Sequence, residues 1–247
     1  MKKVLWREMR RNEFEEAIKS DAVVMIPVGS TEQHGNHLPV NTDMNCCFRI
    51  AQRCAEVIDE FPVLVTPPVW LGFSEEHMKY PGTISLKFHT FIDVLTEVAT
   101  SVAAHGFKKI FLLNGHGGNA GAIASMRRKL MAEDNVASCV GYTYFKLIDE
   151  ELKSLSEADY RIGHAGEMET SLQLYLQPDL VDKKTASWTL GVIGDPTKAT
   201  YEKGKRLFEA AVNAISRVIR DYHSGKLEDS LVYQRDISSD FHKYVQL

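Results

Sequence analysis

The segment Lys109-Ile-Phe-Leu-Leu-Asn-Gly-His-Gly-Gly-Asn119 joins a short apolar run to a glycine-rich loop, and a helical pattern begins directly after it at Ala120. An apolar run of this length, bounded by turn residues, is typical of a buried strand. The glycines that follow permit a tight turn into the helix. A strand, a tight loop and a helix in this order predict part of a βαβ unit.

The same alternation of strand and helix extends along the chain on both sides of this segment. The predicted strands cover residues 22–26, 63–66, 109–113 and 136–142, and the predicted helices cover 12–19, 43–60, 90–105, 120–134, 166–176 and 201–223. This alternation predicts an α/β fold with a mostly parallel sheet between helical layers. Because no repeat, low-complexity run or linker interrupts it, we expect a single domain over residues 1–247.

Composition argues against several classes of function. The 247 residues carry a net charge of −4, without the basic excess of nucleic-acid-binding proteins. No apolar stretch is long enough for a membrane span or, at the N-terminus, for a secretory signal. The four cysteines fit neither a metal-binding CxxC pattern nor a disulfide framework. We therefore expect a reducing, cytoplasmic setting, with no nucleic-acid or membrane partner.

The loop that follows the first predicted strand is rich in metal-ligating residue types. Within residues 29–43 it holds Glu32, His34, His37 and Asp43. Neutral imidazole and carboxylate are suitable ligands for Zn²⁺ or Mn²⁺. Ligands of open α/β sheets bind beyond the carboxyl ends of the strands. The pattern therefore favours a metal site over the alternative, a polar surface loop.

Two further clusters each have two interpretations. His116 lies among glycines between a strand and a helix, so it is either a metal ligand or part of a phosphate-binding turn at a helix N-terminus. His164, Glu167 and Glu169 open a later helix. The spacing of three residues places His164 and Glu167 on one helix face. Alternatively, carboxylates in a first turn only compensate the helix dipole.

Together the three clusters resemble, in order, the signatures of the creatininase (creatinine amidohydrolase) family. The matching stretches are Gly29-Ser-Thr-Glu-Gln-His-Gly-x-His-Leu-Pro-x-x-Thr-Asp43, Asn114-Gly-His-Gly-Gly-Asn119 and His164-Ala-Gly-x-x-Glu-Thr-Ser171. The resemblance spans residues 22–220 and implies a three-layer α/β/α domain around a dinuclear metal centre, commonly assembled as a hexamer. It also implies a hydrolase that opens a C–N bond with water activated between two metal ions.

The resemblance further implies a small-molecule substrate, which would be a cyclic amide, a linear amide or a formamide. Ring-opening hydrolysis of a cyclic ketone or lactone stays open as an alternative, as does a lyase or isomerase reaction at the same metals. The implied cofactors are two divalent ions per subunit, zinc or manganese or both, with iron as a further choice.

The resemblance also assigns roles to individual residues. It gives Glu32 and His116 to one metal, His34 to the other, and Asp43 to both. His164 is similar to the histidine that moves protons during ring opening, and Glu169 is similar to a glutamate beside the site. These two are the expected catalytic residues.

One departure from the family pattern concerns Gly118. In creatininase itself a glutamate stands two residues after the histidine that matches His116, and it completes the second metal site. This chain has glycine there. We expect Glu167 to supply the missing ligand, because its spacing from His164 would aim it at the site. The departure argues against creatinine as the substrate.

Overall fold

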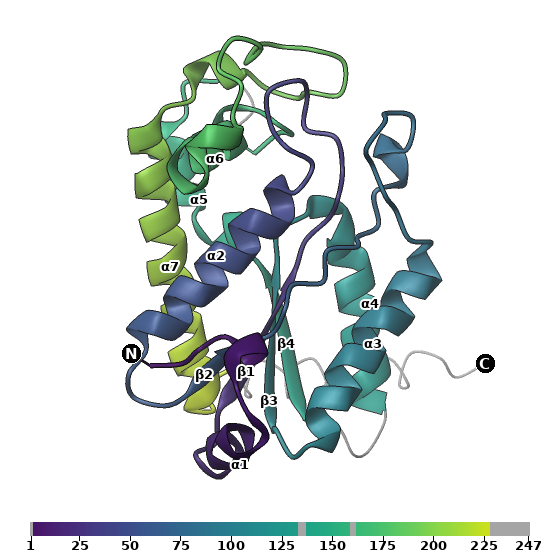
Figure 1. Cartoon of the computed structure of the whole chain (residues 1–247), viewed down its shortest axis with the longest axis vertical. Coiled ribbons are helices and arrows are strands. Elements are labelled where there is room, and N and C mark those ends of the chain that lie inside the picture. Colours follow the sequence, from purple (N-terminus) through teal and green to yellow (C-terminus); the bar gives the residue numbers. More distant parts are fainter. Residues whose placement is uncertain (1, 133–136, 159–161, 228–247) are drawn as a thin grey trace, which may run out of the picture.

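The computed structural model describes residues 2–132, 137–158 and 162–227. Its centre is a four-stranded sheet in the order β2-β1-β3-β4 (Figure 1). The strands are β1 (Val23–Val28), β2 (Val63–Val65), β3 (Lys109–Asn114) and β4 (Ser138–Thr143). All neighbouring strands pair in parallel, which confirms the predicted sheet.

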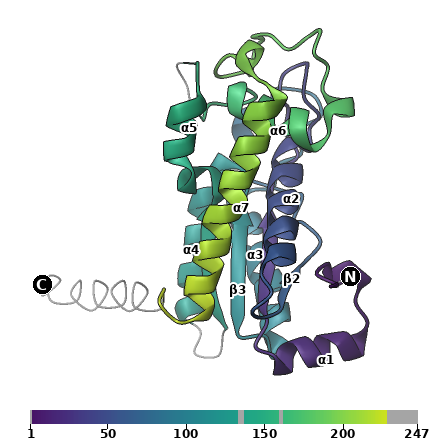
Figure 2. The same cartoon turned by 90° about the vertical axis from the view of Figure 1, so that its left-hand side faces the viewer.

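Helices cover both faces of this sheet. On one face pack α2 (Thr42–Val57), α6 (Glu167–Leu176) and α7 (Tyr201–His223), and on the other pack α3 (Phe88–Ala104) and α4 (Ala120–Ala132) (Figure 2). The predicted three-layer α/β/α arrangement is therefore confirmed.

Strand β1 shows why continuous apolar runs marked the strands. Val23 and Met25 contribute to the core beneath α2 and α7, whereas Val24 and Ile26 contribute to the core beneath α3 and α4. Because both faces of a parallel sheet are buried, successive residues on a strand are all apolar. The run identifies the strand without showing which residue faces which layer.

The ends of several predicted elements differ from the structure. Helix α1 (Arg11–Lys19) begins one residue earlier than predicted, and its capping carboxylate is Glu13, which accepts from the Arg10 amide at 2.7 Å. The short helix α5 (Asp149–Leu155) was not predicted. Parts of the predicted elements at 133–136 lie outside the described residues. None of the described helices is long and apolar enough to cross a membrane.

One end of the sheet gathers the loops that carry ligand-type residues, at the top of Figure 1. A Cβ at Gly115 would lie only 2.4 Å from the carbonyl oxygen of Asp43, so only glycine lets the loop after β3 run against the start of α2. This close approach places His116 beside Asp43. The loop after β1 reaches the same point with Glu32 and His34.

Candidate metal centre and active site

Four ligand-type side chains meet where these loops converge. His116 Nδ1 lies 3.1 Å from Glu32 Oε1 and 3.2 Å from Asp43 Oδ2. His34 Nε2 lies 3.2 Å from Asp43 Oδ1, the other oxygen of the same carboxylate. All four side chains are buried. The structure therefore places Asp43 between the two histidines, with Glu32 beside His116.

Hydrogen bonds to backbone oxygens determine which ring nitrogens carry protons. His34 Nδ1 lies 3.1 Å from the carbonyl oxygen of Glu32, and His116 Nε2 lies 3.1 Å from the carbonyl oxygen of Phe73. A carbonyl only accepts, so each of these nitrogens must donate a proton. In the neutral rings, the other nitrogen then directs a lone pair at carboxylate oxygens. Such an arrangement is repulsive unless a cation lies between the two groups.

Several buried polar atoms at this point have no hydrogen-bond partner. They are both carboxylate oxygens of Glu32, Nε2 of His34 and Oδ2 of Asp43. An unpaired buried polar atom costs about 1–3 kcal/mol, so such a group calls for an explanation. Ligand atoms of a tetrahedral ion with bonds of about 2.0–2.1 Å lie about 3.3 Å apart. The observed separations of 3.1 and 3.2 Å fit this geometry.

The electrostatics of the cluster also favour cations. Burial disfavours the charged form of His34, but Asp43 and Glu169 outweigh burial and raise the pKa of His34 well above its usual value. Burial likewise opposes the charged form of His116, yet Asp43 and Glu32 raise the pKa of that ring. The carboxylates of the cluster therefore favour positive charge at both rings.

Glu169 is a third carboxylate of this cluster. Its Oε2 lies 3.8 Å from His34 Nε2 and accepts from the Ala165 amide at 2.5 Å. Ligand atoms of His34, His164 and Glu169 all lie within 4.8 Å of one another, a separation compatible with a shared ion. Glu169 therefore adds a second carboxylate beside His34, next to Asp43.

Glu167 does not lie at the cluster, which corrects the expectation that it supplies a metal ligand. Its carboxylate pairs with Lys203 and accepts from Ser156 Oγ at 3.1 Å and the Ala158 amide at 3.0 Å. The expected shared face with His164 fails because α6 begins only at Glu167, after Ala165 with a φ of 52°. The helical spacing rule does not apply before the helix begins.

A cavity of about 460 Å³ opens onto the cluster. Asp43, His116 and Glu169 contribute to its lining beside the cluster, and Tyr80 and Ile193 also line it. This volume is typical of sites for small molecules. The cavity therefore connects the ligand-type residues with the space that a substrate needs.

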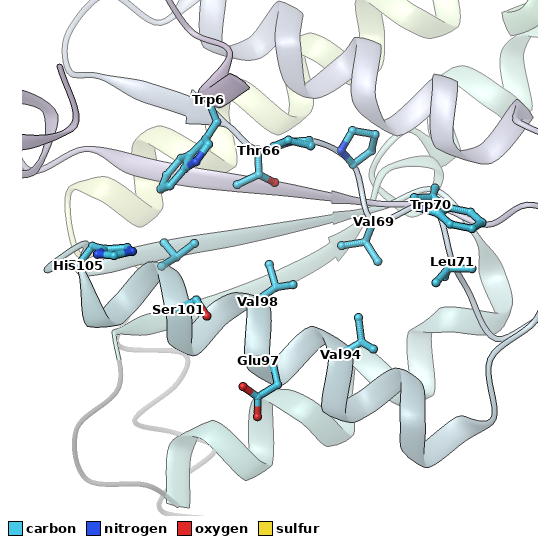
Figure 3. Close-up of a pocket in the computed structure, with 13 residues that line it drawn as sticks. Trp6, Thr66, Val69, Trp70, Leu71, Val94, Glu97, Val98, Ser101 and His105 are labelled. Atoms are coloured by element: carbon cyan, nitrogen blue, oxygen red, sulfur yellow. The ribbon is translucent and has the colours of Figure 1, made fainter. Parts of the chain in front are cut away.

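A separate groove of about 530 Å³ lies between α3 and the segment 66–71 (Figure 3). It is larger than the cavity at the cluster, but most of its lining side chains are apolar. Glu97 and His105 are its only titratable lining residues within the described chain. Size alone would favour this groove, whereas the chemistry favours the cavity at the cluster.

Comparison with known proteins identifies the family. The family model for creatininase, described as creatinine amidohydrolase, matches residues 7–219. This chain belongs to the creatininase family. A crystal structure of creatinine amidohydrolase (creatininase) is similar to this creatininase-family chain with a TM-score of 0.76 and 29% identity, over 90% of this chain and 99% of that one. The predicted family and hydrolase class are confirmed.

Relatives within the creatininase family carry different names. The mycofactocin precursor peptide peptidase of Mycolicibacterium smegmatis is 34% identical over 80% of this chain and 84% of that protein. The creatinine amidohydrolase of Pseudomonas putida is 27% identical over 89% and 97%. The 3-dehydro-scyllo-inosose hydrolase of Thermotoga maritima is 26% identical over 91% and 86%. Family membership therefore establishes a hydrolase without naming its substrate.

Solved creatininases similar to this chain include forms with two different metals. A mutant creatininase of Zn-Zn type has a TM-score of 0.76 and 29% identity, over 90% of this chain and 98% of that one. A manganese creatininase has a TM-score of 0.71 and 28% identity, over 89% and 98%. Ligand-type groups in this creatininase-family chain are consistent with a metal-binding protein of the same kind.

His164 lies next to the cluster in this creatininase-family chain. Its Nε2 lies 2.7 Å from the carbonyl oxygen of Gln33, and its Nδ1 lies 3.5 Å from Glu32 Oε1. Its ring centroid lies 4.3 Å from that of His34. His37 instead has its Nε2 3.1 Å from the carbonyl oxygen of Ala165 and 3.0 Å from Thr170 Oγ1.

Gln33 and His77 are further residues of the site. Gln33 contacts both His77 and His164 through its side-chain nitrogen, at 3.0 Å each. The rings of His77 and His164 stack with centroids 4.2 Å apart. His77 lines the cavity, and Gln33 carries no charge that would mark it. Its place between Glu32 and His34 was the only signal in the sequence.

Proposed function

We propose that this creatininase-family hydrolase holds two divalent metal ions and hydrolyses the C–N bond of a small amide. One ion would be held by Glu32, His116 and Asp43, and the other by His34, Asp43 and Glu169. The observation that carries this proposal is the convergence of an unpartnered ring nitrogen and unpartnered carboxylate oxygens beside the cavity. When bound, such ions would lower the pKa of a water and polarise the substrate carbonyl.

His164 is the proposed proton carrier of the reaction. Its Nε2–H donates to the carbonyl oxygen of Gln33 at 2.7 Å, which leaves Nδ1 bare on the side of Glu32. In this tautomer the ring can accept a proton from the attacking water and deliver it to the departing nitrogen, the usual role of histidine in acid–base catalysis. The backbone hydrogen bond also holds the ring in this orientation.

Zinc and manganese are the proposed ions. Mixed nitrogen and oxygen ligand sets accept both metals, and iron as an alternative. Solved relatives include a Zn-Zn form and a manganese form. The cluster here presents two imidazole nitrogens together with carboxylate oxygens, a donor set that suits either metal.

The proposed substrate is a cyclic amide, a linear amide or a formamide. A linear amide within a peptide is supported by the relative named as a peptide peptidase. Ring opening of a cyclic ketone or lactone is the second candidate, which the relationship to an inosose hydrolase favours. Both reactions add water to a carbonyl carbon, so the same site would serve them.

Creatinine is not the proposed substrate, because Gly118 stands where creatininase itself has a glutamate that completes the second metal site. The loop at Gly118 also has no room for that side chain. A Cβ there would lie 2.5 Å from His116 Nε2 and 2.6 Å from the carbonyl oxygen of Phe73. A side chain at 118 would thus displace the ring that it is meant to assist. Glu169 is our proposed replacement for that carboxylate.

Metal content per chain tests the proposal, with Glu169→Gln and Glu167→Gln as a matched pair. We expect about two ions in the wild type, two in Glu167→Gln and fewer in Glu169→Gln, since only Glu169 faces His34. Hydrolysis of candidate amides in ¹⁸O-labelled water should place the label in the acid product. A wild type that retains no metal after incubation with Zn²⁺ or Mn²⁺ would refute the proposal.

The setting and assembly of the protein are also proposals. All four cysteines are unpaired and buried, which supports a reducing, cytoplasmic setting. A hexamer is proposed from the family resemblance. Light scattering coupled to size-exclusion chromatography tests it, and a monomer mass of about 28 kDa would contradict it.

A further inference from the structure

The side-chain amide of Gln33 has only one orientation that fits its neighbours. Its Oε1 accepts from the Gly35 amide at 2.9 Å, and its Nε2 donates to the carbonyl oxygen of Gly191 at 2.8 Å. A flipped amide would place its NH₂ group against the Gly35 N–H and its oxygen against the carbonyl oxygen of Gly191. The two backbone groups therefore fix Nε2 as the atom that faces His77 and His164.

This orientation determines the tautomer of His77. Gln33 Nε2 has two hydrogens, and one is used by the carbonyl oxygen of Gly191. His164 Nε2 already carries a proton, because it donates to the carbonyl oxygen of Gln33, so it cannot accept the second hydrogen. That hydrogen goes to His77 Nδ1 at 3.0 Å. The proton of the neutral His77 ring is therefore on Nε2.

The Nε2–H of His77 lies on the cluster side of the ring. This nitrogen is 3.7 Å from Glu32 Oε1, too far for a hydrogen bond to that oxygen. His77 also lines the 460 Å³ cavity and stacks on His164. A protonated nitrogen cannot bind a metal ion, so His77 is not a ligand in this tautomer, although it lies within reach of Glu32 and His164.

We propose that His77 is a further catalytic residue, whose Nε2–H donates a hydrogen bond to the substrate carbonyl oxygen as negative charge develops on it. This inference rests on the proposed hydrolase function and adds a donor to it. The stacked pair then presents two complementary groups: His164 offers a bare nitrogen that can take a proton, and His77 offers an N–H that stabilises the oxyanion. Gln33 holds both rings in these roles.

The chemistry of the site explains why a neutral donor is useful there. Removing one fixed donor from an oxyanion site commonly lowers kcat by about 10²–10³-fold. Such a donor is effective because it is already oriented before the substrate arrives. Gln33, anchored on Gly35 and Gly191, provides that orientation for His77.

Two substitutions at His77 separate the donor from the contact with Gln33. Asparagine places its amide near the position of Nδ1 and lacks a group at Nε2, whereas glutamine places its amide near Nε2. The first readout is metal content, which we expect to be unchanged in both variants. The second is the affinity of the zinc-loaded proteins for acetohydroxamic acid, whose carbonyl oxygen mimics that of a substrate amide, measured by calorimetry.

We expect His77→Asn to bind acetohydroxamic acid about fivefold to tenfold more weakly than the wild type, which corresponds to one lost hydrogen bond. His77→Gln should stay within about twofold, because one amide replaces one N–H donor. On any hydrolysed amide, His77→Asn should lower kcat about 10²-fold with little change in KM, and His77→Gln should restore part of the loss.

Other outcomes would overturn the inference. Equal affinity for acetohydroxamic acid in all three proteins would show that His77 does not contact the oxygen. Loss of metal in His77→Asn would show that His77 supports metal binding instead. A wild type that binds no metal would refute the proposed function, and this inference with it, before any binding of acetohydroxamic acid is measured.

Discussion

Replacing Gly118 by alanine should weaken metal binding, whereas the same change at Gly117 should not. A Cβ at 118 would lie 2.5 Å from His116 Nε2 and 2.6 Å from the carbonyl oxygen of Phe73. These two atoms form the 3.1 Å hydrogen bond that orients the His116 ring. A Cβ at 117 would meet nothing within 4 Å. The two variants add the same methyl group to the same loop, so they form a matched pair.

The magnitude at Gly118 follows from the crowding of its neighbours. An extra methyl in a well-packed site costs about 1–3 kcal/mol. The strain is relieved either by rotating the His116 ring away from its partners or by moving the backbone at Phe73. If all of it appears in metal binding, Kd rises about 5-fold to 150-fold. Any remainder should appear as a lower free energy of unfolding of the metal-free protein.

Calorimetric titration with Zn²⁺ and urea unfolding of the metal-free protein measure the two parts. Their sum for Gly118→Ala, relative to Gly117→Ala, is the predicted quantity. Equal zinc affinity and equal free energy of unfolding in the two variants would refute the reasoning that the His116 ring is held by close contact with residue 118.

Three further predictions concern protons and stability. Zn²⁺ binding near pH 7 should release about one to two protons, because the metal displaces the protons held by His34 and His116. Calorimetry in buffers of different ionisation enthalpy measures this release, and a titration that releases no protons would contradict the prediction. Burial opposes the charge on Lys203, but Glu157 and Glu167 outweigh burial and raise the pKa of Lys203. The charged lysine therefore stabilises the folded state below about pH 10, and this stabilisation is lost as pH rises through the raised pKa. Lys203→Met should therefore have a lower free energy of unfolding than the wild type at about pH 8, and the two values should converge toward about pH 12. Thr200 caps α7 by accepting a hydrogen bond from the Lys203 amide. Thr200→Ala should therefore lower Tm by about 2–4 °C, and an unchanged Tm would mean that the cap contributes nothing.

The fold and the gathering of the ligand-type loops could be predicted because they follow from local pattern and parallel topology, whereas the role of each residue was taken from the family resemblance. Apolar runs bounded by glycine and proline located the strands, since both faces of the sheet are buried. The carboxyl ends of neighbouring parallel strands share one edge, so Glu32 and His116 had to lie near each other once β1 and β3 were adjacent. Asp43 joined them because α2 begins at that edge.

The choice between Glu167 and Glu169 could not be made from spacing, because it depends on where α6 begins. Two residues correspond to about 200° around a helix, so the two carboxylates point to nearly opposite sides. Gly166 is extended and Ala165 has a left-handed backbone, which breaks the helical relation to His164. This local conformation is set by tertiary contacts that the sequence pattern does not carry.

The most direct test of the two-metal account is the anomalous diffraction of crystals of the zinc-loaded protein, measured on both sides of the zinc absorption edge. The account predicts two zinc peaks, one on each side of Asp43. One peak should contact Glu32 and His116 and the other should contact His34 and Glu169, while Glu167 stays paired with Lys203. A single peak, or a second peak held without Glu169, would contradict it.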